Sequence, residues 1–338
     1  MPYHHDIGGD STMATRQRPE DMLALLDKVQ DLVRQSSFTT TYKFAVLRTI
    51  CDLAIELPED ADAVALEDLA ERVLRLYWRQ AVPYRVAGGR AVSLHFSNNA
   101  DSTPVILRRI TELRAQQAKR NFAFPDAAQL APHRRAVVPD LRRYVLRCLQ
   151  PTDDPFLYTL ERRLIRFQPG VLATFRQFNS LIRDLVESRW ARTVERWTAR
   201  EVEEVRGSDA LHQHLFGAER SNLRSVVEPM MELQRGLCFF SKRQLRGRGA
   251  DAAHVDHFIP WSWTHDDSVP NLVLSTRSQN LSKSDSLPSA ADRRRWQARN
   301  ADHAETLREI AREVGLAFNP EATHRMAEWA YRAARRSA

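Results

Sequence analysis

The sequence predicts a mainly α fold, in which a helical N-terminal region is followed by a small α+β module and by C-terminal helices. Apolar residues recur at helical spacing through much of the first half, whereas strand formers and clustered glycines appear only after about residue 226. The chain has 338 residues, 43% of them hydrophobic and 28% charged. It is therefore long enough for two or three cores and too apolar to be disordered.

These changes in composition divide the chain into four expected segments. They are a flexible tail at 1–18, a helical region at 19–225 with a break near 122–155, a separate module at 226–290, and C-terminal helices at 291–338 that pack on the module. The stretch from Phe122 to Pro139 is rich in Pro and Ala, and it is expected to form a long loop inside the helical region.

Two helices in the first half are predicted most clearly. The stretch "TYKFAVLRTICDLAIEL" at 41–57 places Phe44, Leu47 and Cys51 on one stripe, which is typical of a buried helix. The stretch "ALEDLAERVLRLYWRQ" at 65–80 follows the same pattern and has its acidic residues early, where the helix dipole favours them. From Leu157 the chain is expected to return to helices, the clearest of which carries Phe175 and later apolar residues on one face.

The charge pattern bears on binding partners. The chain has 50 Lys+Arg and 43 Asp+Glu, giving a net charge of +7, which fits a polyanionic partner but equally a mildly basic solvated surface. Between Asp52 and Glu71 there are eight carboxylates and no basic residue, so this surface is expected to repel phosphate. A run without acidic residues carries the candidate nucleic-acid-binding residues Arg235, Lys242, Arg243, Arg246 and Arg248.

Some classes of protein are not expected. No run approaches the roughly 18 apolar residues of a membrane span, and the N-terminus lacks an apolar signal core. The three cysteines, Cys51, Cys148 and Cys238, are odd in number and widely spaced, so we expect no disulfide framework and a cytoplasmic protein.

The chemistry gathers in "HVDHFIPWSWTHDDSVPNLVLSTRSQNLSKSD", residues 254–285. Apolar residues around Asp256 and His257 predict a short strand that ends at Pro260, and "LVLST" predicts a second strand after Asn271. Asn280 and Lys283, three positions apart, would share one face of a following helix or turn. Strand, loop, strand and helix would then bring an acid, a histidine, an amide and an ammonium together.

These side chains suit the hydrolysis of a phosphodiester. An imidazole with a pKa of about 6.5 can take a proton from water, and a hard divalent cation held by oxygen ligands neutralises charge on phosphate. Taken singly, each residue has a plainer interpretation. His257 could be a half-buried histidine, Asp256 a turn acid, Asn271 a turn residue, and the pair Asn280 and Lys283 an exposed helix edge.

The stretch resembles the HNH endonucleases of the ββα-metal class. It is similar to the HNH domain of RNA-guided CRISPR nucleases and to stand-alone bacterial HNH proteins. The resemblance covers about 50 of the 338 residues, from Cys238 to Pro288, with "DHFIPWS", "NLVL" and "NLSKSD" as its motifs. The anchors His257, Asn271 and Asn280 follow at intervals of 14 and 9 residues.

The resemblance implies a role for each matching residue. His257 would be the general base, and Asp256 and Asn280 would hold Mg²⁺ or Mn²⁺. Asn271 would fix the loop that presents the histidine, and Lys283 would contact the scissile or an adjacent phosphate.

The flanking residues qualify the resemblance. Many similar stand-alone proteins carry paired cysteines, but here Cys238 is followed by Ser241, and Gln279 precedes Asn280, so structural zinc is not expected. His254 and His265 are minor candidates for metal contact. Trp261 and Trp263 are expected to pack the loop.

The resemblance therefore implies a metal-dependent endonuclease acting on DNA, with RNA as an alternative substrate, in the setting of bacterial defence or restriction. The helices between 42 and 80 would suit contacts with a protein partner or a second copy. The alternative function is a nucleic-acid-binding or regulatory protein whose HNH module is vestigial or activated by a partner.

Overall fold

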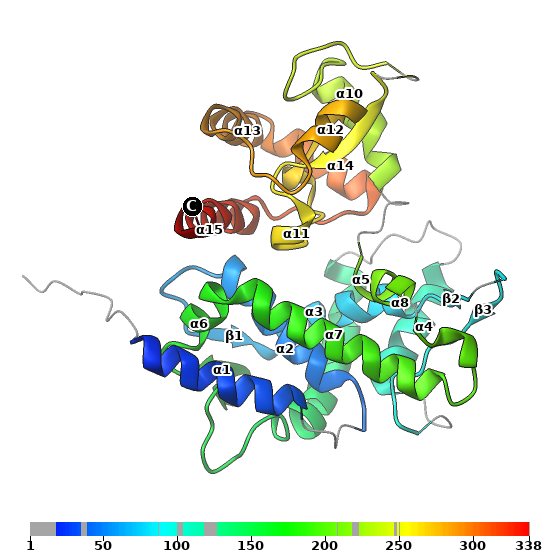
Figure 1. The fold of residues 1–338 in the computed structure, drawn as a ribbon, viewed down its shortest axis with the longest axis vertical. Helices are drawn as coiled ribbons and strands as arrows, with labels where there is room; N and C mark the ends of the chain where they lie inside the picture. The colour runs from blue at the N-terminus through cyan, green and yellow to red at the C-terminus, as the bar shows by residue number, and fades with distance from the viewer. Residues whose placement is uncertain are drawn as a thin grey trace, which may run out of the picture.

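The computed structural model describes residues 18–34, 39–86, 88–99, 104–117, 127–207, 209–217, 223–246, 249 and 251–337. It is mainly α, with a helical N-terminal half, a small α+β unit and C-terminal helices, as the sequence predicts (Figure 1). No described helix is long and apolar enough to cross a membrane.

The N-terminal half is built around one buried helix, α2. The helices of this half are α1 (Pro19–Arg34), α2 (Tyr42–Glu56), α3 (Leu66–Gln80), α4 (Val105–Gln117), α5 (Ala127–Asp140), α6 (Val171–Gln177), α7 (Asn179–Thr198) and α8 (Asp209–Phe216), with shorter turns η1 (Leu141–Leu146) and η2 (Glu203–Val205). Most of α2 is buried, and it packs against α3, α6 and α7. The predicted helices at 41–57 and 65–80 are confirmed as α2 and α3.

Small strands interrupt this half where only helices were expected. An antiparallel sheet has the order β1 (Ala63–Ala65), β5 (Leu164–Phe167), β4 (Tyr158–Leu160), and a second pair joins β2 (Tyr84–Arg85) to β3 (Ala91–Val92). The prediction that the chain returns to helices at Leu157 was therefore wrong by about a dozen residues. The strands are two to four residues long, too short for a periodic pattern to reveal, and β1 and β5 come together from distant parts of the chain.

The Pro- and Ala-rich stretch also differs from its prediction. A long loop was expected at 122–139, but residues 127–140 form α5 with Pro132 and Pro139 inside it. Leu130 and Val137 are buried in the core of this half, and Arg134 pairs with Glu71 of α3. Tertiary packing outweighs the backbone hydrogen bonds that the prolines remove.

The C-terminal part contains η3 (Arg224–Val226), α10 (Val227–Leu233), β6 (Ala253–His257), α11 (Trp261–Thr264), η4 (Val269–Asn271), β7 (Leu272–Thr276), α12 (Arg277–Lys283), α13 (Ala290–Asp302), α14 (Ala304–Val314) and α15 (Pro320–Ser337). Strands β6 and β7 are antiparallel, with Val255 opposite Leu274 and His257 opposite Leu272, and α12 packs against both. We call β6, β7 and α12 the ββα unit. Strand formers at 237–240 make no strand, and only an isolated bridge joins Leu237 to Gln244.

Local signals set the helix ends after the ββα unit. Ser289 Oγ accepts a hydrogen bond from Asp292 N at 3.1 Å and so caps the N-terminus of α13. Gly315 ends α14 with a φ of 70°, a conformation that glycine adopts readily. Trp296 of α13 stacks on Phe258, 4.6 Å between ring centres, and Leu307 of α14 lies in the core with Leu272 and Leu274. The C-terminal helices thus cover the ββα unit.

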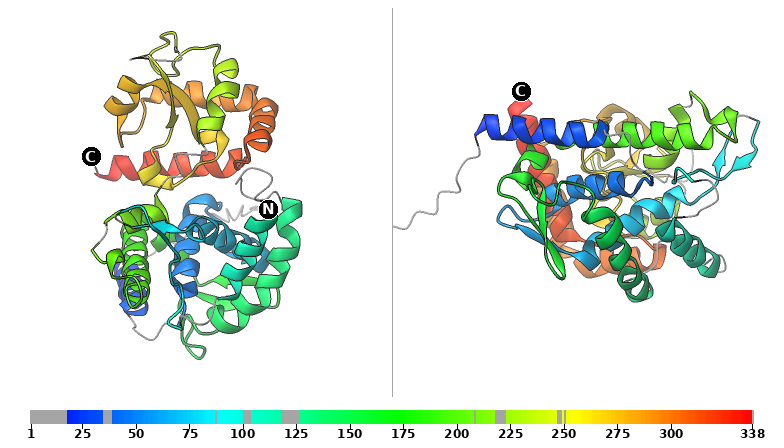
Figure 2. Two further views of the ribbon diagram at one scale, coloured as in Figure 1. Left: turned by 90° about the vertical axis from the view of Figure 1, so that its right-hand side faces the viewer. Right: turned by 90° about the horizontal axis from the view of Figure 1, so that it is seen from below.

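Helix α15 lies between the two halves (Figures 1 and 2). It packs against α2, where Ile55 meets Ala322 and Met326, and it also contacts α11. Trp329 Nε1 donates to Arg176 O of α6 at 2.8 Å. The helical half and the ββα unit therefore share an apolar and hydrogen-bonded boundary.

The acidic stretch 52–71 is not a free negative surface, contrary to the prediction. Six of its eight carboxylates pair with arginines, most of them distant in sequence. Asp62 pairs with Arg166, for example, and Glu59 with Arg332. The acids lie close together in the sequence, whereas most of the arginines that pair with them are distant in sequence and approach them only in the folded chain.

Candidate active site

The ββα unit places Asp256 and His257 at the last two positions of β6. Phe258 and Ile259, which follow, are buried in the apolar core with Trp296, and Pro260 then ends the extended segment. Phe258 N donates to Asn271 O at 2.7 Å, so the segment remains tied to the start of β7 beyond the last strand residue. Asp256 and His257 are therefore held between a paired strand and a packed apolar core.

Asp256 is buried and forms an ion pair with Lys283 at the end of α12. Lys283 Nζ donates to Asp256 Oδ1 at 3.0 Å and to the carbonyl oxygen of His257 at 2.7 Å. Burial raises the pKa of the Asp256 carboxyl, and the nearby Lys283 ammonium opposes this rise. Lys283, expected at a phosphate, thus has its ammonium directed into the unit in this structure.

The second carboxylate oxygen of Asp256 differs from the first. Oδ2 is buried and has no hydrogen-bond partner among the described residues. An unpaired buried carboxylate oxygen is costly, and a cation is a group that would satisfy it.

Asn271 closes the loop between the strands. It is fully buried; its Oδ1 accepts from Ile259 N at 2.9 Å, and its Nδ2 donates to Ile259 O at 3.1 Å and to Asp266 O at 2.9 Å. One side chain thereby joins the segment after His257 to the loop at 266. These are contacts that a loop-fixing asparagine would make.

The His257 imidazole is held on two sides. Nε2 lies 2.7 Å from Asp267 Oδ1, and the ring centre is 5.5 Å from that of Trp261. Nδ1 has no hydrogen-bond partner in the described part of the chain, and it is not among the buried unpartnered atoms, so water can reach it. No sequence pattern distinguished Asp267, which contacts His257, from the polar loop around it.

Asn280 is on α12, which packs against β6, and its half-buried side chain has no protein partner within the described ranges. Those ranges contain no group of three or more His, Cys, Asp or Glu residues that could hold a metal. A cation at this site would therefore depend on the Asp256 carboxylate and an amide oxygen such as that of Asn280. Both are hard oxygen donors, so the residues present fit Mg²⁺ or Mn²⁺.

Comparison with known families decides what the unit is. Residues 238–289 match the family model described as HNH endonuclease. We call residues 238–289 the HNH module, because this segment matches the HNH endonuclease family. No solved structure matches the chain significantly.

The match of the HNH module carries general properties. An HNH module indicates a nuclease-type function and binding to nucleic acid, and HNH nucleases generally use divalent metal ions. The match spans the ββα unit and the loop before it, so the N-terminal helices and α13 to α15 lie outside it.

Trp261, Trp263 and His265 follow β6 in the HNH module. His265 Nδ1 is 3.1 Å from Arg48 Nη2 of α2, so this ring faces the helical half. Trp261 stacks on His265 at 4.8 Å, and Trp263 Nε1 donates to Asp285 O at 3.1 Å. The tryptophans pack the loop, as expected. His254 is a half-buried residue of β6.

The basic patch comprises the described residues Arg235, Lys242, Arg243 and Arg246; Arg248 lies outside the described residues. All four are exposed, and no carboxylate of the described chain forms an ion pair with any of them. Lys242 Nζ lies 5.3 Å from the Phe239 ring centre, and Arg295 of α13 contacts the same ring at 5.4 Å. The patch thus continues toward α13.

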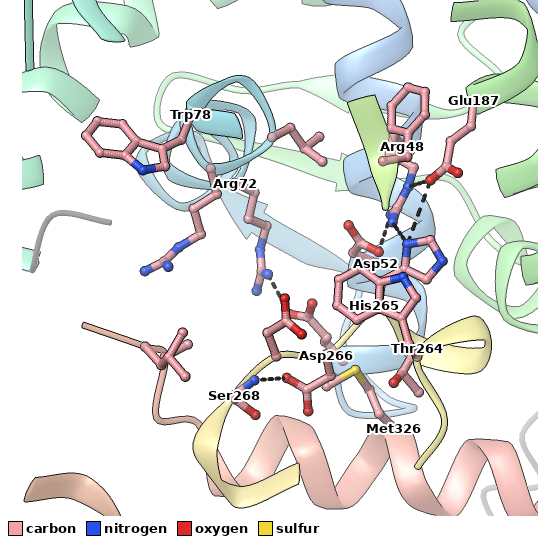
Figure 3. A pocket seen from close by; sticks show the side chains of 18 of the residues that line it. Arg48, Asp52, Arg72, Trp78, Glu187, Thr264, His265, Asp266, Ser268 and Met326 are labelled. Carbon is pink, nitrogen blue, oxygen red and sulfur yellow. Dashed lines mark hydrogen bonds and ion pairs between the residues drawn. The ribbon is translucent and has the colours of Figure 1, made fainter. Parts of the chain in front are cut away.

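A cavity of about 290 Å³ lies between the HNH module and the helical half. Its wall includes Arg48 and Glu56 from α2, and Trp261, His265 and Asp267 from the module. Figure 3 shows Arg48 and His265 meeting on one side of the cavity, and Asp266 bonded to Ser268 on another. Burial raises the pKa of both Glu56 and Asp266.

Proposed function

We propose that the chain is a metal-dependent endonuclease that hydrolyses phosphodiester bonds in DNA, with His257 as the general base. The observation that carries this proposal is the juxtaposition at the end of β6. There, the buried unpartnered oxygen of Asp256 neighbours an imidazole whose Nδ1 is open to water. An acid and a base with these environments suit hydrolysis better than structural support.

The protein's part in the reaction follows from the contacts. His257 Nδ1 would take a proton from water while the water oxygen attacks phosphorus. The bond from phosphorus to the sugar oxygen breaks, and that oxygen takes a proton from solvent. Asp256 Oδ2 and the Asn280 amide would hold the divalent cation, which when bound supplies positive charge to the phosphate. Asn271 keeps the loop in place, and Lys283 keeps Asp256 oriented.

The basic patch supports nucleic acid as the substrate. Its arginines and lysine are exposed and lack acidic partners in the described chain, so they are available to phosphate. Its contacts would position the backbone without reading the base sequence.

The test is incubation of supercoiled plasmid with Mg²⁺, Mn²⁺ or a chelator. Wild-type protein should convert it to nicked or linear DNA only with metal, and His257→Ala should slow this by about 10²-fold or more. His303→Ala is the matched control, because it removes an exposed imidazole outside the ββα unit, and it should retain activity within a few-fold. Equal cleavage by His257→Ala would exclude this residue as the base.

A second function is a nucleic-acid-binding or regulatory protein with a partner-activated HNH module. One observation favours it: Lys283 already neutralises Asp256, so an ammonium competes with a cation for this carboxylate. Binding of a labelled duplex by wild-type protein, with no cleavage in either metal, would support this second function over the first.

A further inference from the structure

We infer that Asp267 is a positioning residue for the His257 imidazole. Its carboxylate accepts a hydrogen bond from the N–H group at Nε2, and this bond directs Nδ1 toward the reacting water. This inference rests on the proposed function and deepens it. Neither the family match nor the sequence motifs assign a role to this position.

The hydrogen bond determines which ring nitrogen can accept a proton. The Nε2 to Oδ1 distance is 2.7 Å, and an ionised carboxylate can only accept. Nε2 must therefore carry the hydrogen, which leaves the lone pair of the neutral ring on Nδ1. Nδ1 is the nitrogen without a partner in the described chain and within reach of water.

A second contact restricts the ring. Trp261 lies beside the imidazole, with a ring-centre distance of 5.5 Å and an interplanar angle of 52°. Trp261 is itself stacked on His265 at 4.8 Å. With Asp267 at its Nε2 edge and an anchored indole beside it, the imidazole has little freedom to rotate.

Asp267 is held in turn by the residue before it. Asp266 Oδ1 accepts from Ser268 N at 2.9 Å, and its Oδ2 accepts from Thr323 Oγ1 of α15 at 2.9 Å. The carbonyl of Asp266 accepts from Asn271 Nδ2. These bonds fix the backbone on one side of Asp267 to α15 and to η4, so its carboxylate has a defined direction.

The surroundings of Asp267 argue against a general surface role. Its side chain is 28% exposed and lines the cavity between the halves, yet its one ion pair in the described structure is with His257. The three arginines on the cavity wall form ion pairs with other acids: Arg48 with Asp52 and Glu187, Arg72 with Glu56, and Arg75 with Glu71. Asp267 therefore remains available to the imidazole.

The test combines kinetics with a measurement that needs no cleavage. In Asp267→Ala, kcat should fall about 10- to 100-fold with KM nearly unchanged, because the phosphate contacts are intact. Asp267→Asn can still accept from Nε2 through its amide oxygen, so its kcat should lie between those of wild type and Asp267→Ala. Asp302→Ala, which removes an exposed acid from the end of α13, is the matched control and should leave kcat unchanged.

The second measurement is the ¹⁵N NMR spectrum of the His257 ring in protein without metal or nucleic acid. Wild type should show the form protonated on Nε2, and Asp267→Ala a mixture of the two neutral forms. An unchanged ring spectrum, or a change confined to KM, would overturn the inference. If wild type cleaves no plasmid, the proposed function fails, and the ring spectrum still decides whether Asp267 orients His257.

Discussion

Arg48 Nη2 lies 3.1 Å from His265 Nδ1, which joins α2 to the loop of the HNH module across 217 positions of sequence. His265 stacks on Trp261, and Trp261 contacts His257. Arg183 of α7 adds a second link, with its Nη1 3.4 Å from Trp263 O. The helical half thus braces the loop that carries Asp267, and it is part of the support of the proposed active site.

Replacing Arg48 should reveal how much this brace contributes to stability. Burial alone would lower the pKa of Arg48, but the Asp52 and Glu187 carboxylates outweigh burial and raise it. Arg48→Met leaves these carboxylates without this partner, and urea unfolding should show a loss of about 3–5 kcal/mol. Arg75→Met removes a more exposed arginine paired with Glu71, and should cost about 1 kcal/mol or less. Equal losses would contradict the brace.

Lys283→Met should expose the competition between ammonium and cation at Asp256. The pair is buried, with side chains 9% and 6% exposed, so its loss should lower the free energy of unfolding by about 3 kcal/mol. Millimolar Mg²⁺ or Mn²⁺ should then raise the melting temperature more in Lys283→Met than in wild type, because the carboxylate is free. Lys242→Met, on the exposed patch, is the control; a metal-induced shift no larger than that of wild type would argue against a cation at Asp256.

Asn271→Ala should be the most destabilising single amide truncation in the HNH module. The substitution removes three hydrogen bonds and leaves backbone groups of Ile259 and Asp266 without this partner. We expect the free energy of unfolding to fall by about 3 kcal/mol. Asn300→Ala is the comparison, because Pro270 O keeps two other donors, Trp296 and Arg299. Arg299 also loses its bonds to Asn300 Oδ1 but still donates to Leu272 O and Pro270 O. Chemical denaturation measures both, and similar losses would show that Asn271 does not fix the loop.

Asp266 should give stability a distinct pH dependence. Burial raises the pKa of the Asp266 carboxyl, although hydrogen bonds from Ser268 and Thr323 oppose this rise. In the folded protein the carboxyl therefore stays protonated at pH values above its ordinary pKa of about 3.9. Where the folded state binds more protons than the unfolded state, the free energy of unfolding falls as pH rises.

The comparison with Asp266→Asn isolates this effect. The stability of wild type relative to the variant should decrease as pH rises from about 4 through the raised pKa, and level off above it. Urea unfolding at pH 4 to 7 measures the difference, with Asp302→Asn as the control. A difference that increases with pH would mean that the carboxylate, and not the acid, is the favoured buried form.

The basic patch should account for part of the salt dependence of nucleic-acid binding. Alanine at Lys242, Arg243 and Arg246 together should weaken duplex binding and reduce the slope of log K against log salt by about 2 to 3. Alanine at Arg162, Arg163 and Arg192, exposed arginines of the helical half, removes the same charge. Fluorescence anisotropy at several salt concentrations measures both, and equal changes would place the nucleic acid elsewhere.

Local patterns in the sequence were enough to predict the parts of the HNH module. The alternation around Val255 and the run at 272–276 each depend on neighbours within a few residues. Helices α2 and α3 were predicted for the same reason. Where the expected helices or loops were wrong, at β5 and α5, contacts with distant segments contribute to the conformation.

Local patterns in the amino-acid sequence are sufficient to predict the ββα unit, its polar residues and their order. The contacts of Asp267 with His257, of Lys283 with Asp256 and of Arg48 with His265 become visible only in the folded chain. The two kinds of feature differ in the range of the interactions that produce them. Strand alternation and helix capping act over a few residues along the chain, whereas an ion pair or ring contact depends on how remote elements pack in space.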